Sequence, residues 1–202
     1  MTHQSPGLRN RYYLMRHGES ESDRLGIINS DPGKPYRLTA TGMEQSAESI
    51  RQSTLSELGS RVLIYCSQFP RTKQTALIAS QLLDADLPTV NKLLNERNFG
   101  LLEGESVANY ARVWDADKAV GAIASGVERL RQDKVELPTV VAQRAARLVA
   151  IAEYRHDKQD ILFVSHDDPL QIMQAIASGV QPTRHRDLPP FEPAEIRQVA
   201  NS

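Results

Sequence analysis

Short, largely apolar runs alternate along this chain with longer stretches in which apolar residues recur every three or four positions. The runs lie at Tyr12–Met15, Arg61–Cys66 and Ile161–Val164, with a weaker one at Thr89–Leu93. Continuous apolar runs of this length are typical of strands that are covered on both faces. The pattern therefore predicts a set of buried strands.

Helices are predicted in the stretches with helical spacing. Thr41 and Glu44 have the spacing of a capping box. Pro70 suits the first turn of a helix, and Asp168-Pro169 is a good start for another. The expected inward-facing residues are Met43, Ala47 and Ile50, then Ile78 and Leu82, then Val141, Ala145, Leu148 and Ala152 with Arg144 and Arg147 facing outward, and last Ile172, Met173 and Ile176.

Alternating strands and helices predict an α/β fold with a parallel sheet between layers of helices. Residues 97–138 break the alternation and are expected to form a small, mostly helical, cap-like insertion. Two loops rich in turn residues, 29–36 and 181–193, do not have the character of interdomain linkers. The 202 residues are therefore expected to form a single domain, residues 1–202, with that insertion.

The charge balance and the apolar runs exclude several kinds of protein. With 24 Lys and Arg against 25 Asp and Glu, the formal net charge is −1, so a strong electrostatic footprint for nucleic acid or anionic membrane is absent. The longest uninterrupted apolar runs have five residues, whereas a membrane span needs about 20. The first residues lack the apolar core of a secretory signal. The single cysteine, Cys66, is too few for a disulfide or a zinc cluster, so a cytoplasmic location is expected.

Polar side chains follow the predicted strands, where ligands bind in parallel α/β sheets. Arg16-His17 follows the first strand, and Ser67 and then Arg71 follow the second. Ser165-His166-Asp167 follows the last clear strand, and Glu96 precedes the insertion. The sequence thus predicts a mouth of the sheet that contains two histidines, two arginines and a glutamate.

These residue types fit phosphoryl transfer without a metal ion. A neutral imidazole such as His17 is a good nucleophile towards phosphorus. Arg16, Arg71 and a protonated His166 would hold the oxygens of the transferred group. Glu96, whose pKa a bound phosphate would raise, could protonate the leaving oxygen and later deprotonate the attacking water.

The ordered set of motifs resembles the histidine phosphatase superfamily, in its phosphoglycerate mutase-like branch. The motifs are Leu14-Met15-Arg16-His17-Gly18-Glu19-Ser20, Leu38-Thr39-x-x-Gly42-x-x-Gln45, Cys66-Ser67 with Arg71-x-x-Gln74-Thr75-Ala76, Asn95-Glu96 with Gly100 and Glu103-Gly104, and Val164-Ser165-His166. The resemblance implies a three-layer α/β/α sandwich with a mostly parallel sheet and a last strand at Glu195–Val199. It also implies a phosphorylated His17, a phosphate pocket of Arg16, Arg71 and His166, Glu96 as the general acid and base, and no metal or cofactor.

Three features depart from the usual pattern of this family. Asp167 stands where the family commonly has glycine. Three consequences are open: its side chain adds crowding and negative charge, or it turns away from the phosphate, or it shares the role of proton donor. Asp23 stands where relatives often carry asparagine, which removes an amide donor. Glu96 and His166 are only 70 residues apart, as in the phosphatase members, which favours hydrolysis over mutase chemistry.

The sequence therefore predicts a metal-independent phosphomonoesterase that hydrolyses a small phosphorylated substrate through a phosphohistidine. The expected phosphate-binding residues are Arg16, Arg71, His166, Ser20 and Asp167, although Ser20 could instead cap a turn. The alternatives are a phosphoglycerate mutase-type phosphotransferase and a weakly active regulatory or binding member of the family. The expected partner is a small phosphate ester, with no nucleic acid or membrane, and a homodimer is left open.

Substrate choice is expected to come from the loops beside this mouth. The loop 24–37 and the segment Arg184-His185-Arg186 carry cations that could hold a second phosphate or a carboxylate, or could be solvated. Tyr110 and Trp114 in the insertion could form a pocket wall, but core packing is the expected role.

Overall fold

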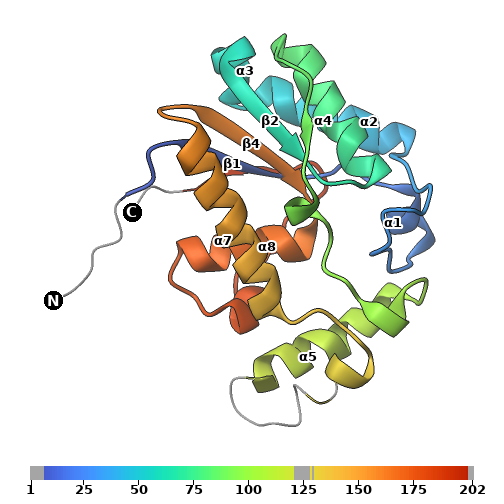
Figure 1. The fold of residues 1–202 in the computed structure, drawn as a ribbon. Coiled ribbons are helices and arrows are strands. Elements are labelled where there is room, and N and C mark those ends of the chain that lie inside the picture. The colour runs from blue at the N-terminus through green and yellow to red at the C-terminus, as the bar shows by residue number, and fades with distance from the viewer. Residues whose placement is uncertain (1–6, 121–127, 129, 200–202) are drawn as a thin grey trace, which may run out of the picture.

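Five strands form one sheet in the order β3-β2-β4-β1-β5, and helices cover both of its faces (Figure 1). This computed structural model describes residues 7–120, 128 and 130–199. The strands are β1 (Arg11–Arg16), β2 (Val62–Cys66), β3 (Thr89–Val90), β4 (Asp160–Ser165) and β5 (Ile196–Gln198). All neighbouring pairs are parallel except β1 and β5, which are antiparallel. The predicted three-layer α/β/α sandwich with a mostly parallel sheet is confirmed.

Helices of very different length connect these strands. The α-helices are α1 (Glu21–Leu25), α2 (Ala40–Gln52), α3 (Leu55–Leu58), α4 (Pro70–Leu83), α5 (Tyr110–Val120), α7 (Pro138–Arg155) and α8 (Asp167–Ala177). The 3₁₀ helices are η1 (Gly59–Arg61), η2 (Lys92–Leu94), η3 (Gly100–Leu102), η4 (Val107–Asn109) and η5 (Pro182–Asp187). The weak strand predicted at residues 89–93 is therefore only two residues long, because Asn91 caps η2 through its side chain.

The sheet separates two hydrophobic cores. Successive residues of β1 point to opposite faces, so that Tyr13 and Met15 enter one core while Tyr12 and Leu14 enter the other. Helices α2, α3 and α4 close the first core, and α7 and α8 close the second (Figure 1). Burial on both faces explains why the central strands are continuous apolar runs.

Helix α2 begins earlier than predicted and uses a different face. Its N-cap is Thr39, whose side chain accepts a hydrogen bond from the Gly42 amide, so the predicted capping box at Thr41 and Glu44 is wrong. Gly42, Ser46 and Ile50 face inward, whereas Met43 is 42% exposed. The inner face carries small residues because the helix backbone passes directly against the Gly18–Glu19 loop, and a Cβ on Gly42 would overlap the Glu19 carbonyl oxygen.

In two further helices, α4 and α7, some side chains face another way than predicted. In α4 the inner face runs through Arg71, Thr75 and Ala79, which leaves Leu82 exposed. In α7 the predicted apolar stripe is confirmed, and Arg147 is exposed. Arg144, however, turns inward and donates hydrogen bonds to the carbonyl oxygens of Leu93 and Glu96, at 2.7 and 3.3 Å.

The segment between β3 and α7 has a hydrophobic cluster of its own. Phe99, Val113 and Leu130 belong to this third cluster, together with Ile28 from the loop after α1. The predicted insertion at residues 97–138 contains η3, η4 and α5. Its residues 121–127 and 129 lie outside the described part of the chain, as do residues 1–6 and 200–202 of the predicted domain.

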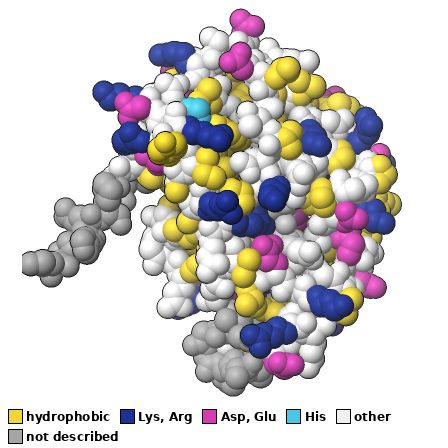
Figure 2. Space-filling model, viewed as in Figure 1, with side chains coloured by type: hydrophobic (Ala, Val, Ile, Leu, Met, Phe, Trp, Pro, Cys, Tyr) yellow, Lys and Arg dark blue, Asp and Glu magenta, His cyan; other side chains and the backbone are white. Residues whose placement is uncertain are grey.

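The surface agrees with the near-neutral charge of the chain. On the face shown in Figure 2, basic and acidic side chains are interspersed with apolar ones. Among the described residues, no helix has the length and apolar character that crossing a membrane requires. Cys66, at the end of β2, is buried, and burial raises the pKa of its thiol to about 11.

Candidate active site

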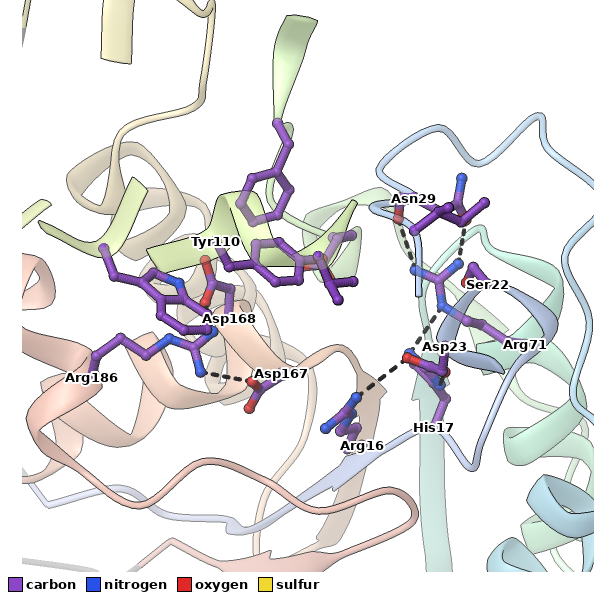
Figure 3. A pocket seen from close by; sticks show the side chains of 15 residues that line it. Arg16, His17, Ser22, Asp23, Asn29, Arg71, Tyr110, Asp167, Asp168 and Arg186 are labelled. Atoms are coloured by element: carbon purple, nitrogen blue, oxygen red, sulfur yellow. Dashed lines mark hydrogen bonds and ion pairs between the residues drawn. The ribbon is translucent and has the colours of Figure 1, made fainter. Parts of the chain in front are cut away.

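A cavity of about 250 Å³ opens at the carboxyl ends of the central strands, as the fold rule for parallel sheets requires (Figure 3). Arg16 and His17 reach it from the end of β1, Arg71 from the first turn of α4, and Asp167 from the first turn of α8. Glu96 reaches it from the loop after η2. The structure thus brings together residues that are up to 151 positions apart in sequence because their strands end at the same edge.

The hydrogen bonds of His17 define its tautomer. Its Nδ1 lies 2.7 Å from the carbonyl oxygen of Gly18, to which it donates, and its Nε2 accepts from Arg71 Nε at 2.9 Å. Burial, together with the positive charges of Arg71 and Arg16, lowers the pKa of His17 to about 3. His17 is therefore a neutral imidazole at pH 7, with its Nε2 lone pair beside a guanidinium.

Arg71 is a buried cation surrounded by acceptors. Its Nη1 donates to Asn29 Oδ1, and its Nη2 donates to the Asn29 carbonyl oxygen at 3.0 Å. The same Nη2 lies 3.0 Å from His166 Nδ1. Burial lowers the pKa of Arg71, although Glu96 and Asp23 oppose this effect. Asn29, which sequence reasoning missed, thus orients the guanidinium from a loop without regular structure.

His166 is the N-cap residue of α8 and is completely buried. Because an arginine can only donate, His166 Nδ1 is the acceptor in its contact with Arg71. Its Nε2 then donates to Ser67 Oγ at 2.9 Å. Burial and the charge of Arg71 hold its pKa well below the ordinary range. The prediction of a protonated His166 is therefore wrong for this geometry, in which the ring is neutral and lies behind Arg71.

Glu96 has the opposite shift in pKa. Its Oε1 accepts from the backbone amide of Arg97 at 2.8 Å, and its Oε2 lies 3.7 Å from His166 Nδ1. Burial, reinforced by the negative charge of Asp168, raises its pKa to about 8 despite the opposing charge of Arg71. A protonated carboxylic acid therefore faces the cavity at neutral pH.

Arg16 and Asp23 form the opposite side of the nucleophile. Arg16 Nη1 donates to the Phe191 carbonyl oxygen at 2.6 Å, and its Nη2 lies 3.5 Å from Asp23 Oδ1. Its Nε is buried and has no partner among the described residues. Burial would raise the pKa of Asp23, but interactions with His17 and Arg16 and hydrogen bonds from Ser20 lower it. Arg16 therefore lines the cavity with one donor that has no partner among the described residues.

Two predicted phosphate-binding residues have other partners. Ser20 is completely buried, caps α1 and forms a capping box with Asp23, and it does not line the cavity. Ser22, in the first turn of α1, lines the cavity instead. Asp167 does line the cavity, but it pairs with Arg186 Nη1 at 2.7 Å and accepts from the Phe191 amide at 3.0 Å. Its negative charge is therefore offset by Arg186.

A buried ionic cluster supports this end of the cavity, and no local pattern in the sequence predicts it. Arg97 is completely buried and donates to both carboxylate oxygens of Asp117 at 2.7 Å and to Asp168 Oδ2 at 3.1 Å. Asp168 also contacts His185 and Arg186, and these partners hold its pKa well below the usual range although burial opposes them. The cluster joins α5, α8 and η5 next to the amide that holds Glu96.

The remaining lining includes aromatic residues of the insertion. Tyr110 and Trp114 line the cavity, the alternative to the expected core packing, and Tyr110 also packs against the third hydrophobic cluster. Arg186 of the segment 184–186 also lines it, whereas Arg24, Lys34 and Arg37 do not. Among the described residues, no group of three or more His, Cys, Asp or Glu side chains has the arrangement of a metal site.

The fold is that of the histidine phosphatase superfamily. The family model for branch 1 of this superfamily matches residues 12–200, and the chain belongs to it. No curated protein matches the chain in sequence.

Solved structures of phosphatases are similar to this chain. The α-ribazole phosphatase of Shigella flexneri is 26% identical, with a TM-score of 0.67 over 93% of this chain and 89% of the other. The phosphoserine phosphatase of Entamoeba histolytica, solved with 3-phosphoglyceric acid, is 20% identical, with a TM-score of 0.72 over 94% and 89%. A mycobacterial glucosyl-3-phosphoglycerate phosphatase is 18% identical, with a TM-score of 0.73 over 93% and 90%. At the two lower identities the likeness concerns the fold alone.

Proposed function

We propose that this protein is a phosphomonoesterase that works without a metal ion or cofactor, through a phosphohistidine formed on His17. The observation that carries the proposal is the state of His17. Its proton is held on Nδ1 by the Gly18 carbonyl, and its pKa is about 3, so Nε2 keeps a lone pair at neutral pH. A neutral, oriented imidazole is the form in which histidine attacks phosphorus.

In the first step, Nε2 of His17 forms a bond to phosphorus while the bond from phosphorus to the leaving oxygen breaks. The donors of Arg71 and Arg16 turn to the phosphoryl oxygens and stabilise their charge as it grows. Glu96, protonated at neutral pH, gives its proton to the leaving oxygen. Neutral His166 receives a hydrogen bond from Arg71 and so positions that guanidinium.

In the second step, water attacks the phosphohistidine. The Glu96 carboxylate left by the first step takes a proton from this water, and the bond between phosphorus and Nε2 breaks. Inorganic phosphate leaves, Glu96 is protonated again and His17 is neutral again. Atoms and charges are thus restored after each turnover.

Asp23 and Asp167 do not favour a protein that only binds phosphate. Both carboxylates have cationic or hydrogen-bond partners in the chain, Arg16 and Ser20 for Asp23 and Arg186 for Asp167. Their negative charge is therefore partly offset before a phosphate arrives. This pairing supports turnover over the regulatory alternative.

We also propose that residues 1–202 form a single domain in which the insertion near residues 97–138 caps the site. Pairing of β5 with β1 supports this, because it joins both ends of the chain in one sheet. A cytoplasmic location and a homodimer stay predictions.

The proposed chemistry is tested by phosphate release from 4-nitrophenyl phosphate and by trapping the intermediate. We expect His17→Ala to abolish release, while His156→Ala, which removes a histidine next to Tyr65 outside the cavity, retains it. Glu96→Gln should slow turnover by about 10²- to 10⁴-fold. In that variant the good leaving group still departs, but water is not activated, so acid-labile, base-stable phosphate should accumulate on the protein. Release by His17→Ala at the wild-type rate would exclude the mechanism.

A further inference from the structure

The end of the cavity away from His17 is lined by an aromatic wall, defined here as Phe99, Tyr110 and Trp114. The rings of Phe99 and Tyr110 meet edge to face, with centroids 4.9 Å apart. Tyr110 and Trp114 are nearly parallel, with centroids 5.4 Å apart and planes 12° apart. Ile27 and Val107 extend this apolar surface. A leaving group that extends from the phosphate towards this side meets rings and aliphatic carbon.

The arginines of the cavity are poorly placed to bind a second negative group of the substrate, in addition to its phosphate, at the aromatic wall. Of the described residues that line the cavity, three are arginines, and two of them, Arg16 and Arg71, flank His17. The third, Arg186, donates to Asp167 and Asp168, and its guanidinium carbon lies 3.9 Å from the centre of the Trp114 ring. Its charge is thus already matched by these two carboxylates, so it is not free to bind a carboxylate or second phosphate on the substrate.

Tyr110 adds a neutral polar group at the boundary between the two ends of the cavity. In Figure 3 its side chain lies between Asn29 and Asp168. No hydrogen bond joins its hydroxyl to the described residues, and only burial and nearby charges act on its pKa. Burial, with the negative charges of Glu96 and Asp168, raises its pKa, so the hydroxyl keeps its proton. It can donate to an ether, hydroxyl or ring nitrogen without requiring charge on the ligand.

From these contacts we infer that the substrate is a phosphomonoester whose leaving group is uncharged and flat, an aromatic or heterocyclic group bound against the aromatic wall. This inference rests on the proposed function and specifies its substrate class. The volume of about 250 Å³ is near the lower limit of roughly 300 Å³ for small-molecule sites, so the group has one or two rings. Phosphoglycerates and bisphosphates are poor substrates, because their second anion would be buried without a free cation.

The first test compares kcat/KM of the wild type for 1-naphthyl phosphate, glycerol 2-phosphate and 3-phosphoglycerate. We expect 1-naphthyl phosphate to exceed 3-phosphoglycerate by at least tenfold, mainly through a lower KM, with glycerol 2-phosphate between them. Equal or better use of 3-phosphoglycerate would overturn the inference while leaving the proposed function intact. No phosphate release from any ester would instead overturn the proposed function.

The second test adds the missing cation. Val107 lines the cavity beside the aromatic wall and is 39% exposed, so Val107→Lys should fold and place an ammonium at this end. We expect its KM for 3-phosphoglycerate to fall at least threefold and its KM for 1-naphthyl phosphate to rise. Leu101→Lys is the matched control, because Leu101 is 62% exposed and does not line the cavity. An unchanged preference in Val107→Lys, or the same change in Leu101→Lys, would contradict the inference.

A third comparison distinguishes another place for a second anion. Glu96 also borders a separate open hollow of about 670 Å³, which is lined by Lys92, Arg131 and Lys134. If 3-phosphoglycerate is a good substrate and Lys92→Ala raises its KM at least threefold, the second anion binds in this hollow and the inference is wrong. We expect Lys92→Ala to leave all three substrates unchanged.

Discussion

At the scale of single residues, burial gives the two groups proposed for catalysis the protonation states that the reaction needs. It lowers the pKa of His17 to about 3 and raises that of Glu96 to about 8. Each shift favours the uncharged form, because charge is costly away from water. One cavity therefore holds a neutral nucleophile and a protonated acid over the same range of pH.

The shift of Glu96 has a cost in stability that depends on pH. The unfolded chain releases this proton near pH 4.5, whereas the folded protein retains it up to about pH 8. Between these values the folded state binds more protons, so the free energy of unfolding should fall by about 1.4 kcal/mol per pH unit from this group. Stability from this group is complete below pH 4.5 and is lost as the pH rises through 8.

Glu96→Gln removes this dependence, because an amide does not titrate. We expect the variant to match the wild type in urea unfolding at pH 4.5 and to be more stable by an amount on the order of several kcal/mol at pH 8.5. An equal difference at both pH values would show that Glu96 does not titrate with a raised pKa.

The sequence predicted most of the central residues of the site but not their supports. Arg16, His17 and Arg71 follow a strand or open a helix, so the rule for strand ends finds them. Glu96 lies in the loop after η2, and its motif, Asn95-Glu96, is what points to it. Asn29 has no such position, and only the tertiary fold brings it to Arg71. Arg97 is the neighbour of Glu96 in the sequence, but its buried pairing with Asp117 and Asp168 depends on the tertiary fold. For Ser20 the sequence does not decide between phosphate binding and capping, because the cap depends on the orientation of Asp23.

At the scale of elements, apolar periodicity found α2, α4, α7 and α8 but misjudged the faces of α2 and α4. The inner faces of α2 and α4 contain Gly42, Ser46 and Thr75, which a hydrophobic pattern does not count. These small residues let the helices approach the loop that carries His17, where Gly18 donates to Thr75 Oγ1 and Thr75 meets Ser46. Which face of each helix turns inward therefore depends on contact with the loop that carries His17 as well as on packing in the core.

Gly42→Ala tests this close approach. Its added methyl group would overlap the Glu19 carbonyl oxygen, so α2 must move away from the Gly18–Glu19 loop. We expect a loss of about 1–3 kcal/mol in unfolding free energy, the usual cost of overpacking, and a drop in phosphate release as His17 shifts. Gly33→Ala, in an exposed loop where the nearest neighbour is the Asp31 side chain, should change neither. A fully active Gly42→Ala protein would refute the positioning role.

At the scale of the whole molecule, the sequence predicted that helices cover both faces of a sheet, but not which strands lie next to each other. Alternation of strands and helices indicates a parallel sheet between helices, and the structure has one. The order β3-β2-β4-β1-β5 and the reversed direction of β5 depend on contacts between distant segments, for which local patterns carry no signal. The positions of residues 97–120 likewise depend on the third hydrophobic cluster and on Arg97.

Asp117→Ala tests how firmly α5 is tied to the rest of the protein. It leaves the buried charge of Arg97 with only Asp168 and a carbonyl oxygen, so we expect a loss of about 3–5 kcal/mol in urea unfolding. Phosphate release should also fall, because the amide of Arg97 holds Glu96. Asp115→Ala, an exposed carboxylate on the same helix, is the control and should be within about 0.5 kcal/mol of the wild type. A similar result for both variants would show that the ion pair contributes little.

The third hydrophobic cluster has a consequence for how such a protein can diverge. Phe99 and Val113 pack in that cluster, away from the two cores that hold the strands, and α5 also carries Tyr110 and Trp114. Substitutions that reshape the wall therefore leave the strand ends, and with them His17 and Arg71, in place. Related proteins can therefore come to accept different substrates through substitutions in this small part of the chain, while the residues of the chemical step stay the same.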